Sequence, residues 1–260
     1  MRWVRYSDRH GLHHGILNAD HIEQIEGDMF SDWRKNGVTH ALRDVQLEVP
    51  VIPGTFFAAG LNYAAHVLEA AKMTGTLASL PTHADVGYRA NNALLRHEGV
   101  VIIPADATEA IQYEAEIVAV IGRKAHRVSE RDAMDHVFGY TIGNDVSERN
   151  WQKQDRTFFR SKNSDTFKPM GPWIETEVNL DQARTTVHVN GKETIRFQTL
   201  DMIFSIAEFI SRTSKYCTLL PGDVMWMGTD GTSPNIRHKD VVEIEITGLG
   251  VLRNQFLLES

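Results

Sequence analysis

Two short stretches of the chain combine acidic residues with apolar surroundings. Glu114 and Glu116 lie two positions apart before the apolar run at residues 117–121, and Asp145 follows the strand-like run at residues 138–142. Side chains two positions apart on a β-strand project from one face, so Glu114 and Glu116 should point together. Buried carboxylates are costly unless a cation compensates them, and an all-oxygen set favours Mg²⁺, Mn²⁺ or Ca²⁺ over zinc. The pattern is compatible with a divalent-metal site, although Glu-x-Glu taken alone is more often a strand's solvent face and Asp145 could be a helix N-cap.

A histidine and a glutamate stand three positions apart in a helical pattern at residues 64–73. This separation puts His66 and Glu69 on one helix face, where the carboxylate could orient the imidazole and raise its basicity. A general base that activates water needs this arrangement. A salt-bridged pair on an exposed helix is the alternative.

Further polar residues follow in the second half of the chain. Arg149 and Gln152 share a helical face and could hold a substrate carboxylate or carbonyl group. Lys162 could neutralise the charge of a developing enolate. The turn at residues 228–231 includes Thr229, whose hydroxyl could hold an anion together with backbone amides. Taken singly, each is more typically an ordinary surface or turn residue.

The elements that must position these residues are mostly strands. Strand-like runs occur at residues 56–60, 117–121, 138–142, 224–227 and 241–246, and a hairpin pattern with an Asn-Gly turn occurs at 187–192. Helical patterns occur at residues 64–73, 129–136 and 202–211, the second with Ser129 as its N-cap. Because strands outnumber helices and do not alternate regularly with them, we expect a β-rich mixed α/β fold. The long connection at residues 74–92 is typical of a lid or binding loop.

A proline-rich stretch at residues 50–54 marks a boundary. We expect a small N-terminal region at residues 1–50 and a catalytic domain at residues 51–260. Three histidines in the first region suggest a metal, but a solvated turn is the stronger interpretation because no cysteine or matching pair is nearby: His10, His13 and His14.

Composition limits the class of protein. The chain has 260 residues, 42% of them hydrophobic, and a formal net charge of -7, which argues against a nucleic-acid or anionic-membrane partner. Its one cysteine, Cys217, excludes an internal disulfide and a thiolate metal cluster. The start shows no signal-peptide pattern, and no run approaches the ~20 apolar residues of a membrane span. We therefore expect a cytoplasmic protein.

Several motifs occur together in a fixed order, at residues 60–69, 113–116, 139–149, 162–167 and 171–173. This order resembles the fumarylacetoacetate hydrolase (FAH) superfamily over roughly residues 50–258. The resemblance implies a catalytic domain built as a mixed β-roll or β-sandwich, usually dimeric, with a Mg²⁺ or Mn²⁺ site.

The resemblance also implies roles for individual residues. The metal ligands would be Glu114, Glu116 and Asp145; the catalytic residues would be His66, Glu69 and Lys162; the substrate contacts would be Arg149, Gln152 and Thr229. The chain departs from the family pattern at two places near the pocket. Arg89 replaces the lysine of the usual Phe-Leu-Lys-Pro element, and the turn at Thr229 lacks its usual proline. We expect Arg89 to contact the substrate as well.

The implied function is that of a metal-dependent hydrolase that cleaves a carbon-carbon bond in a small acylpyruvate or related diketo acid, in aromatic-compound or organic-acid catabolism. The alternative is a decarboxylase or isomerase of 2-oxo or 2-hydroxy dioates, as in a homoprotocatechuate-type pathway. A more distant alternative is a non-catalytic, metal-stabilised binding protein. In the first two cases we expect a homodimer that acts on a small oxo-acid substrate.

Overall fold

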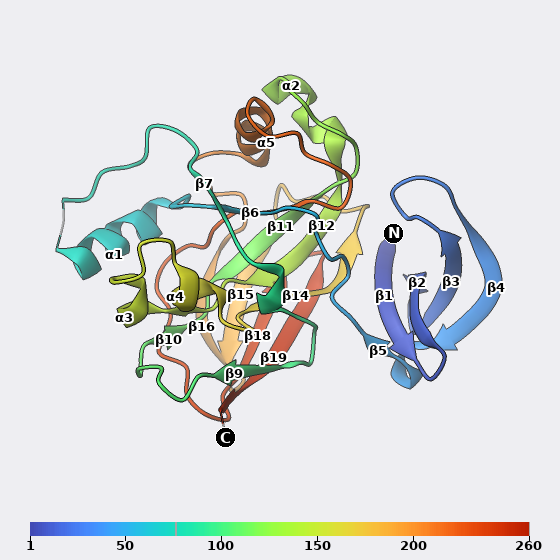
Figure 1. Ribbon diagram of the computed structural model, residues 1–260, viewed down its shortest axis with the longest axis horizontal. Helices are drawn as coiled ribbons and strands as arrows, with labels where there is room; N and C mark the ends of the chain where they lie inside the picture. The colour runs from blue at the N-terminus through green and yellow to red at the C-terminus, as the bar shows by residue number, and fades with distance from the viewer. Residues whose placement is uncertain (76, 260) are drawn as a thin grey trace.

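The computed structural model describes residues 1–75 and 77–259 as a small β-lobe beside a larger β-rich body (Figure 1). The expectation of a β-rich mixed α/β fold is confirmed. None of the described helices combines the length and apolarity needed to cross a membrane. The helices are α1 (Ala64–Thr74), α2 (Glu130–Ala133), α3 (Arg149–Gln152), α4 (Phe159–Asn163) and α5 (Ile206–Ser214).

The N-terminal lobe is an antiparallel meander. Its strands are β1 (Arg2–Asp8), β2 (Gly11–Asn18), β3 (His21–Gly27), β4 (Trp33–Ala41) and the short β5 (Gln46–Leu47). The strands bury a small core of their own, formed by Val4, Tyr6, Leu17 and Ile22. The strand β1 also pairs with β14 (Lys168–Glu175) of the larger body. The lobe is therefore hydrogen-bonded to the larger body.

His10, His13 and His14 do not gather at one point of the described structure. His10 lies in the turn after β1, whereas His13 and His14 lie in β2, where successive side chains point to opposite faces. His13 Nε2 lies 3.1 Å from Asp8 Oδ1. The three histidines are not among the described residues that bring three possible ligand atoms within 4.8 Å of one another.

The larger body contains a mixed sheet with β11 near its centre. In space the strands follow the order β1, β14, β12, β11, β17, β6 and β7. All seven residues of β11 are buried, and this burial explains why its sequence is an unbroken apolar run after Glu116. The other strands of this sheet are β6 (Phe56–Ala59), β7 (Val86–Tyr88), β11 (Ala115–Ile121), β12 (Val137–Asn144) and β17 (Val224–Trp226).

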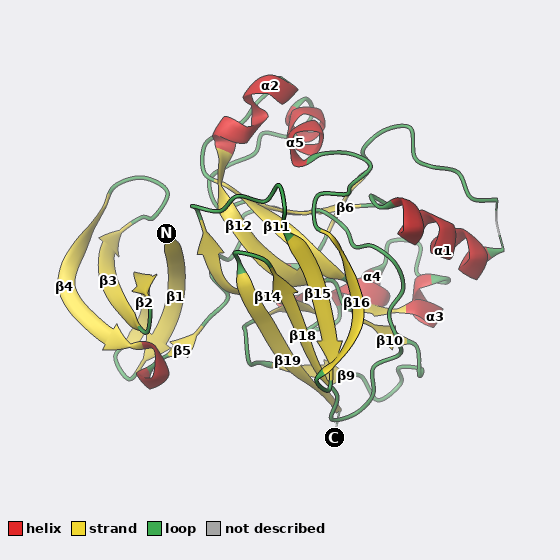
Figure 2. Ribbon diagram, turned by 180° about the vertical axis from the view of Figure 1, so that it is seen from behind, coloured by secondary structure: helices red, strands yellow, loops and turns green. Residues whose placement is uncertain are grey.

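A second sheet of five strands packs against the first and can be followed in Figure 2. Asn190 and Gly191 have φ values of 52° and 76°, which fits the tight hairpin turn predicted from this pair. The strands of this sheet are β9 (Val100–Ile103), β15 (Arg184–Val189), β16 (Lys192–Gln198), β18 (Val241–Ile246) and β19 (Gly250–Leu258). Shorter strands elsewhere are β8 (Leu94–Leu95), β10 (Ile111–Gln112) and β13 (Ser147–Glu148).

The strand β11 contributes to apolar clusters on both of its faces. Ile117 belongs to the largest cluster, which includes Val187 and Ile244 of the second sheet. Val118, on the opposite face, joins a second cluster with Trp226. Apolar contacts on both faces restrain β11, so the acidic residues at its start have fixed positions.

Helix α5 begins later than the apolar pattern predicts. The prediction of a start at residue 202 is wrong, because Ser205 and Glu208 form a capping box that fixes the first helical residue as Ile206. Ser205 Oγ accepts the Glu208 N–H at 3.2 Å, and Glu208 Oε2 accepts the Ser205 N–H at 2.6 Å. The N–H of Phe204, just before the cap, donates to Asn62 Oδ1 at 2.9 Å.

The connection after α1 is more regular than its composition suggests. Residue 76 lies outside the described part, but β7 pairs with β6 through Phe57 and Tyr88, and a short 3₁₀-helix follows at Asn91–Ala93. At the other end of α1, Asn62 Nδ2 donates to the carbonyl groups of Phe204 and Met227, at 3.1 and 2.9 Å. The segment that contains α1 and the connection after it is therefore anchored in the fold at both ends, by Asn62 before α1 and by β7 after it.

Candidate metal centre

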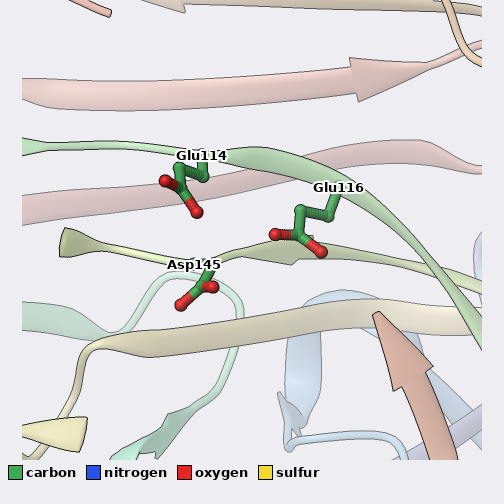
Figure 3. Close-up of side chains that lie close together, drawn as sticks. All are labelled: Glu114, Glu116 and Asp145. Atoms are coloured by element: carbon green, nitrogen blue, oxygen red, sulfur yellow. The ribbon is translucent and has the colours of Figure 1, made fainter. Parts of the chain in front are cut away.

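Three carboxylates meet where β11 begins and β12 ends (Figure 3). Oxygen atoms of Glu114, Glu116 and Asp145 lie within 4.8 Å of one another, and the three residues are 5%, 2% and 1% exposed. The Asp145 N–H donates to the Glu114 carbonyl at 2.9 Å, and the Glu114 N–H donates to Asn144 Oδ1 at 3.2 Å. These two bonds hold the segments together, and the two glutamates point together as their spacing predicts.

Glu116 is the carboxylate with the least electrostatic support. Burial, together with the negative charges of Asp145 and Glu114, raises its pKa to about 8. Its Oε2 accepts the Gly228 N–H at 2.8 Å, and no described ion pair includes it. Glu116 is therefore largely protonated at neutral pH when no cation is bound.

Glu114 is held in the ionised state by two cations. Lys162 Nζ lies 2.6 Å from its Oε2, and Arg149 Nη1 lies 2.7 Å from its Oε1. Burial alone would raise the pKa of Glu114, but these two charges outweigh burial and hold the pKa at about 2. The cations come from α4 and from the first residue of α3.

Asp145 contacts three cations. Arg89 Nη2 and Lys162 Nζ lie 2.7 and 3.0 Å from Oδ2, and Lys168 Nζ lies 2.6 Å from Oδ1. Arg89 Nε adds contacts of 3.2 and 3.1 Å to the two oxygens. Burial opposes ionisation, yet Arg89, Lys162 and Lys168 together hold the pKa of Asp145 well below its usual value.

Lys168 is a site residue that the sequence analysis missed. It is fully buried at the start of β14, where its Nζ also donates to the carbonyls of Val146 and Phe167 at 3.0 and 2.9 Å. Burial is the main reason why its pKa falls to about 7. The available signal was a single charge within an otherwise apolar, proline-containing stretch at residues 167–174.

The residues present fit a divalent cation. The possible ligands are all carboxylate oxygens, the set that hard cations such as Mg²⁺, Mn²⁺ and Ca²⁺ prefer. The raised pKa of Glu116 reports the mutual repulsion and desolvation that such a cation would relieve. Glu114, Glu116 and Asp145 would hold the ion.

His66 and Glu69 do not form the hydrogen-bonded pair that the sequence predicts. His66 Nδ1 lies 3.0 Å from the Gly231 carbonyl oxygen, and its Nε2 lies 3.8 Å from Glu114 Oε1. Glu69 Oε1 instead accepts a bond from Lys72 Nζ at 2.6 Å, and within the described part of the chain no hydrogen bond joins Glu69 to His66. Lys72, one turn along the helix, is positively charged and is therefore the stronger partner for the Glu69 carboxylate. The Gly231 carbonyl, not Glu69, orients the His66 imidazole.

Arg149 and Gln152 lie together, as their helical spacing predicts. Arg149 Nη1 donates to Gln152 Oε1 at 2.9 Å, and Arg149 Nε donates to Gln112 Oε1 at 2.8 Å. Arg149 therefore supports Glu114 and orients Gln152. Thr229 is 6% exposed and follows Gly228, so the turn predicted to hold an anion donates a backbone amide to the Glu116 carboxylate.

Two cavities adjoin each other, and the inner one reaches the centre. The inner one, about 210 Å³, is bordered by Arg89, Glu114, Glu116, Lys162 and Thr229, among others. The outer one, about 230 Å³, is bordered by Glu69, Gln112, Arg149, Lys153 and Thr232, among others. Both cavities share four lining residues: Leu61, His66, Gln152 and Phe158. All seven expected catalytic and substrate-binding residues thus border one or both cavities.

Comparison with known proteins identifies the family. A family model described as fumarylacetoacetate (FAA) hydrolase C-terminal matches residues 55–257. The chain belongs to the fumarylacetoacetate hydrolase family. A second model, described as Rv2993c-like, N-terminal, matches residues 1–50 of this FAH-family protein. The resemblance inferred from the motifs is thereby confirmed.

Relatives of this FAH-family protein carry names from several reaction classes. Oxaloacetate tautomerase YisK of Bacillus subtilis (strain 168) is 33% identical over 255 residues, covering 88% of this chain and 83% of the relative. The 2,4-didehydro-3-deoxy-L-rhamnonate hydrolase of Sphingomonas sp. (strain SKA58) is 36% identical over 214 residues, covering 78% of this chain and 73% of the relative. A crystal structure of 5-carboxymethyl-2-hydroxymuconate delta-isomerase from Mycobacterium smegmatis superposes with a TM-score of 0.90 at 32% identity, covering 100% of both chains.

Proposed function

We propose that this protein is a divalent-metal-dependent hydrolase that cleaves a carbon-carbon bond in a small acylpyruvate-type diketo acid. The observation that carries this proposal is the buried carboxylate triad with Lys162 and His66 on the wall of the adjoining cavity. The two connected cavities, about 210 and 230 Å³, suit a small substrate. Residues 51–260 form the proposed catalytic domain.

A bound divalent cation would polarise the 2-oxo group of the substrate and stabilise negative charge on it. His66 supplies the base. A carbonyl oxygen only accepts hydrogen bonds, so the contact with Gly231 places the proton of the neutral imidazole on Nδ1 and leaves Nε2 free to accept one. Nε2 then takes a proton from water, and the hydroxide adds to the carbonyl carbon distal to the oxo acid.

Cleavage of the carbon-carbon bond sends its electron pair into the enolate of the departing oxo acid. Lys162 borders the cavity and stabilises the enolate charge where it develops. His66, now protonated, returns its proton to the enolate carbon. Gln152, Thr229 and Arg89 orient the substrate from the cavity wall, and Arg149 holds Gln152 in position.

A second candidate is tautomerisation or decarboxylation of a 2-oxo dioate. The contact between Glu69 and Lys72 favours it, because the pair expected to activate water is not formed. The oxaloacetate tautomerase relative, at 33% identity, supports the same reading. In tautomerisation His66 would move a proton between carbon and oxygen with no water consumed; in decarboxylation Lys162 would stabilise the enolate.

One experiment separates these reactions. The protein is incubated with Mg²⁺, Mn²⁺ or a chelator and a panel of acylpyruvates, oxaloacetate and 2-oxo dioates in H₂¹⁸O, and products are identified by mass. Hydrolysis gives two fragments, one of which carries ¹⁸O in its new carboxylate. Tautomerisation leaves the mass unchanged and alters the enol absorbance, and decarboxylation releases CO₂.

Variants test the assigned roles. Glu116→Ala should lose metal-dependent turnover and His66→Ala should lose hydrolysis, while His21→Ala, at an exposed histidine of β3, serves as the matched control. Full turnover in Glu116→Ala would refute the metal mechanism. Metal-dependent stabilisation without consumption of any substrate would instead indicate a binding protein.

We further propose a homodimer in the cytoplasm, as expected for a family member of this kind. Light scattering coupled to size-exclusion chromatography measures the assembly, and a monomeric mass would refute the dimer.

A further inference from the structure

The cations around the triad are unevenly distributed. Both oxygens of Asp145 contact cations, whereas Glu116 accepts a backbone N–H from Gly228 and takes part in no described ion pair. Lys168 and Arg89 contact Asp145 without contacting the other two carboxylates within hydrogen-bond distance. Asp145 is therefore the ligand whose negative charge is most fully compensated before any metal arrives.

The ammonium group of Lys168 is held in one position. It is 0% exposed, and its ammonium group reaches three oxygen acceptors: Asp145 Oδ1 and the carbonyls of Val146 and Phe167. Three acceptors match the three hydrogens of an ammonium group, so this geometry favours the charged form of Lys168 although burial lowers its pKa. Lys168 also borders neither of the two cavities, in contrast to Lys162, so the substrate does not reach it.

A positive charge fixed beside a ligand oxygen opposes the binding of a second positive charge. This repulsion is strong in a buried site, where the effective dielectric constant is well below that of water. Lys168 and a divalent ion would also compete for the same carboxylate. Removing a group that orients a metal ligand typically lowers metal affinity by about 10- to 100-fold. Lys168 carries a charge of the same sign as the ion, so we expect an effect of similar size in the opposite direction.

We propose that Lys168 is a positioning residue that holds the Asp145 carboxylate in place and, through its positive charge, weakens the affinity of the centre for a divalent cation. The inference rests on the proposed metal site. It assigns this chain a centre that binds its ion more weakly than the three carboxylates alone would.

The test compares neutral and charged replacements in the full-length protein. Free Mn²⁺ is measured by electron paramagnetic resonance during titration of the wild type, Lys168→Gln, Lys168→Arg and a control, Lys192→Gln, at one pH and ionic strength. Lys192 is an exposed lysine at the start of β16, so its replacement removes the same charge at the surface. Lys168→Gln should bind Mn²⁺ about tenfold more tightly or more. Lys168→Arg and the control should stay within about threefold of the wild type, because Arg keeps the charge and the surface charge is screened.

A merely structural lysine would not tighten binding when it is removed, so the direction of change is diagnostic. Equal or weaker Mn²⁺ binding in folded Lys168→Gln would overturn the proposal. If Gln prevents folding, Lys168→Met tests the same point with an uncharged chain of similar length. Loss of fold in both, with Lys168→Arg intact, would show a folding role and also overturn it. A wild type that binds no Mn²⁺ would instead refute the proposed function itself.

Discussion

Replacing Glu114 or Glu116 by glutamine should have very different effects on the stability of the metal-free protein. Glu114 contacts Lys162 and Arg149 at 2.6 and 2.7 Å, and the three side chains are buried. Glu114→Gln leaves two buried cations without this anion, and breaking a buried ion pair costs about 3–5 kcal/mol. Glu116 is largely protonated at neutral pH, because its pKa is raised to about 8. Glu116→Gln resembles this protonated acid, so below pH 4.5, where Glu116 is protonated in both the native and the unfolded state, it should change the free energy of unfolding by about 1 kcal/mol or less.

The sign of the pH dependence follows from the raised pKa of Glu116. The native state binds this proton more tightly than the unfolded state, so the stability it contributes is fully present below the ordinary glutamate pKa of 4.5 and is lost as the pH rises toward about 8. The loss can reach about 1.4 kcal/mol per pH unit within that window. Glu116→Gln cannot ionise, so its advantage over the wild type should grow between pH 5 and 8 and then level off.

Urea unfolding in the presence of a chelator, at several pH values, measures both effects. Glu245→Gln, at an exposed position of β18, controls for the loss of one negative charge. Equal destabilisation by Glu114→Gln and Glu116→Gln, or a wild-type pH profile in Glu116→Gln, would refute the reasoning.

Three further predictions concern single residues other than the carboxylates. Asn62→Ala should lower the unfolding free energy by about 3 kcal/mol in urea titrations, because three backbone groups, one buried and two partly buried, lose their partner; no loss would contradict this. Gly143→Ala places a Cβ 2.6 Å from a ring carbon of the buried Trp226, so a cost of about 1–3 kcal/mol should appear as a lower Tm; an unchanged Tm would contradict it. Burial lowers the pKa of His97, so its stability contribution is lost as the pH falls below about 6.5. In His97→Asn the decline in unfolding free energy from pH 7 to pH 5 should therefore be smaller, and an equal decline would contradict the assignment.

Much of the centre could be predicted because it depends on local geometry. The two-residue spacing of Glu114 and Glu116 fixes a common face on an extended chain, and the three-residue spacing of Arg149 and Gln152 fixes a common helical face. In both cases the structure brings the pair together. Such spacings carry over to three dimensions because secondary structure alone determines them.

The sequence was less informative wherever several partners compete for one group. Glu69 shares a helix face with His66, but Lys72 is within reach on the same helix and takes its carboxylate. Lys168 lies in a buried strand, and its partner Asp145 is 23 positions away in the sequence, so no periodicity connects them. The late start of α5 was missed because apolar spacing continues through residues that a capping box keeps outside the helix.

The pairing of β1 with β14 has a practical consequence for anyone who divides the chain. Arg2 and Trp3 pair with the last residues of β14, the strand that begins with Lys168, and the main chain of β14 faces the N-terminal lobe there. Removal of residues 1–50 would leave a row of unpaired amide and carbonyl groups that can recruit a strand from another molecule. The first fifty residues thus cover an edge of the sheet that carries the carboxylates. We expect a protein without them to aggregate or exchange strands, which would interfere with any measurement of its activity.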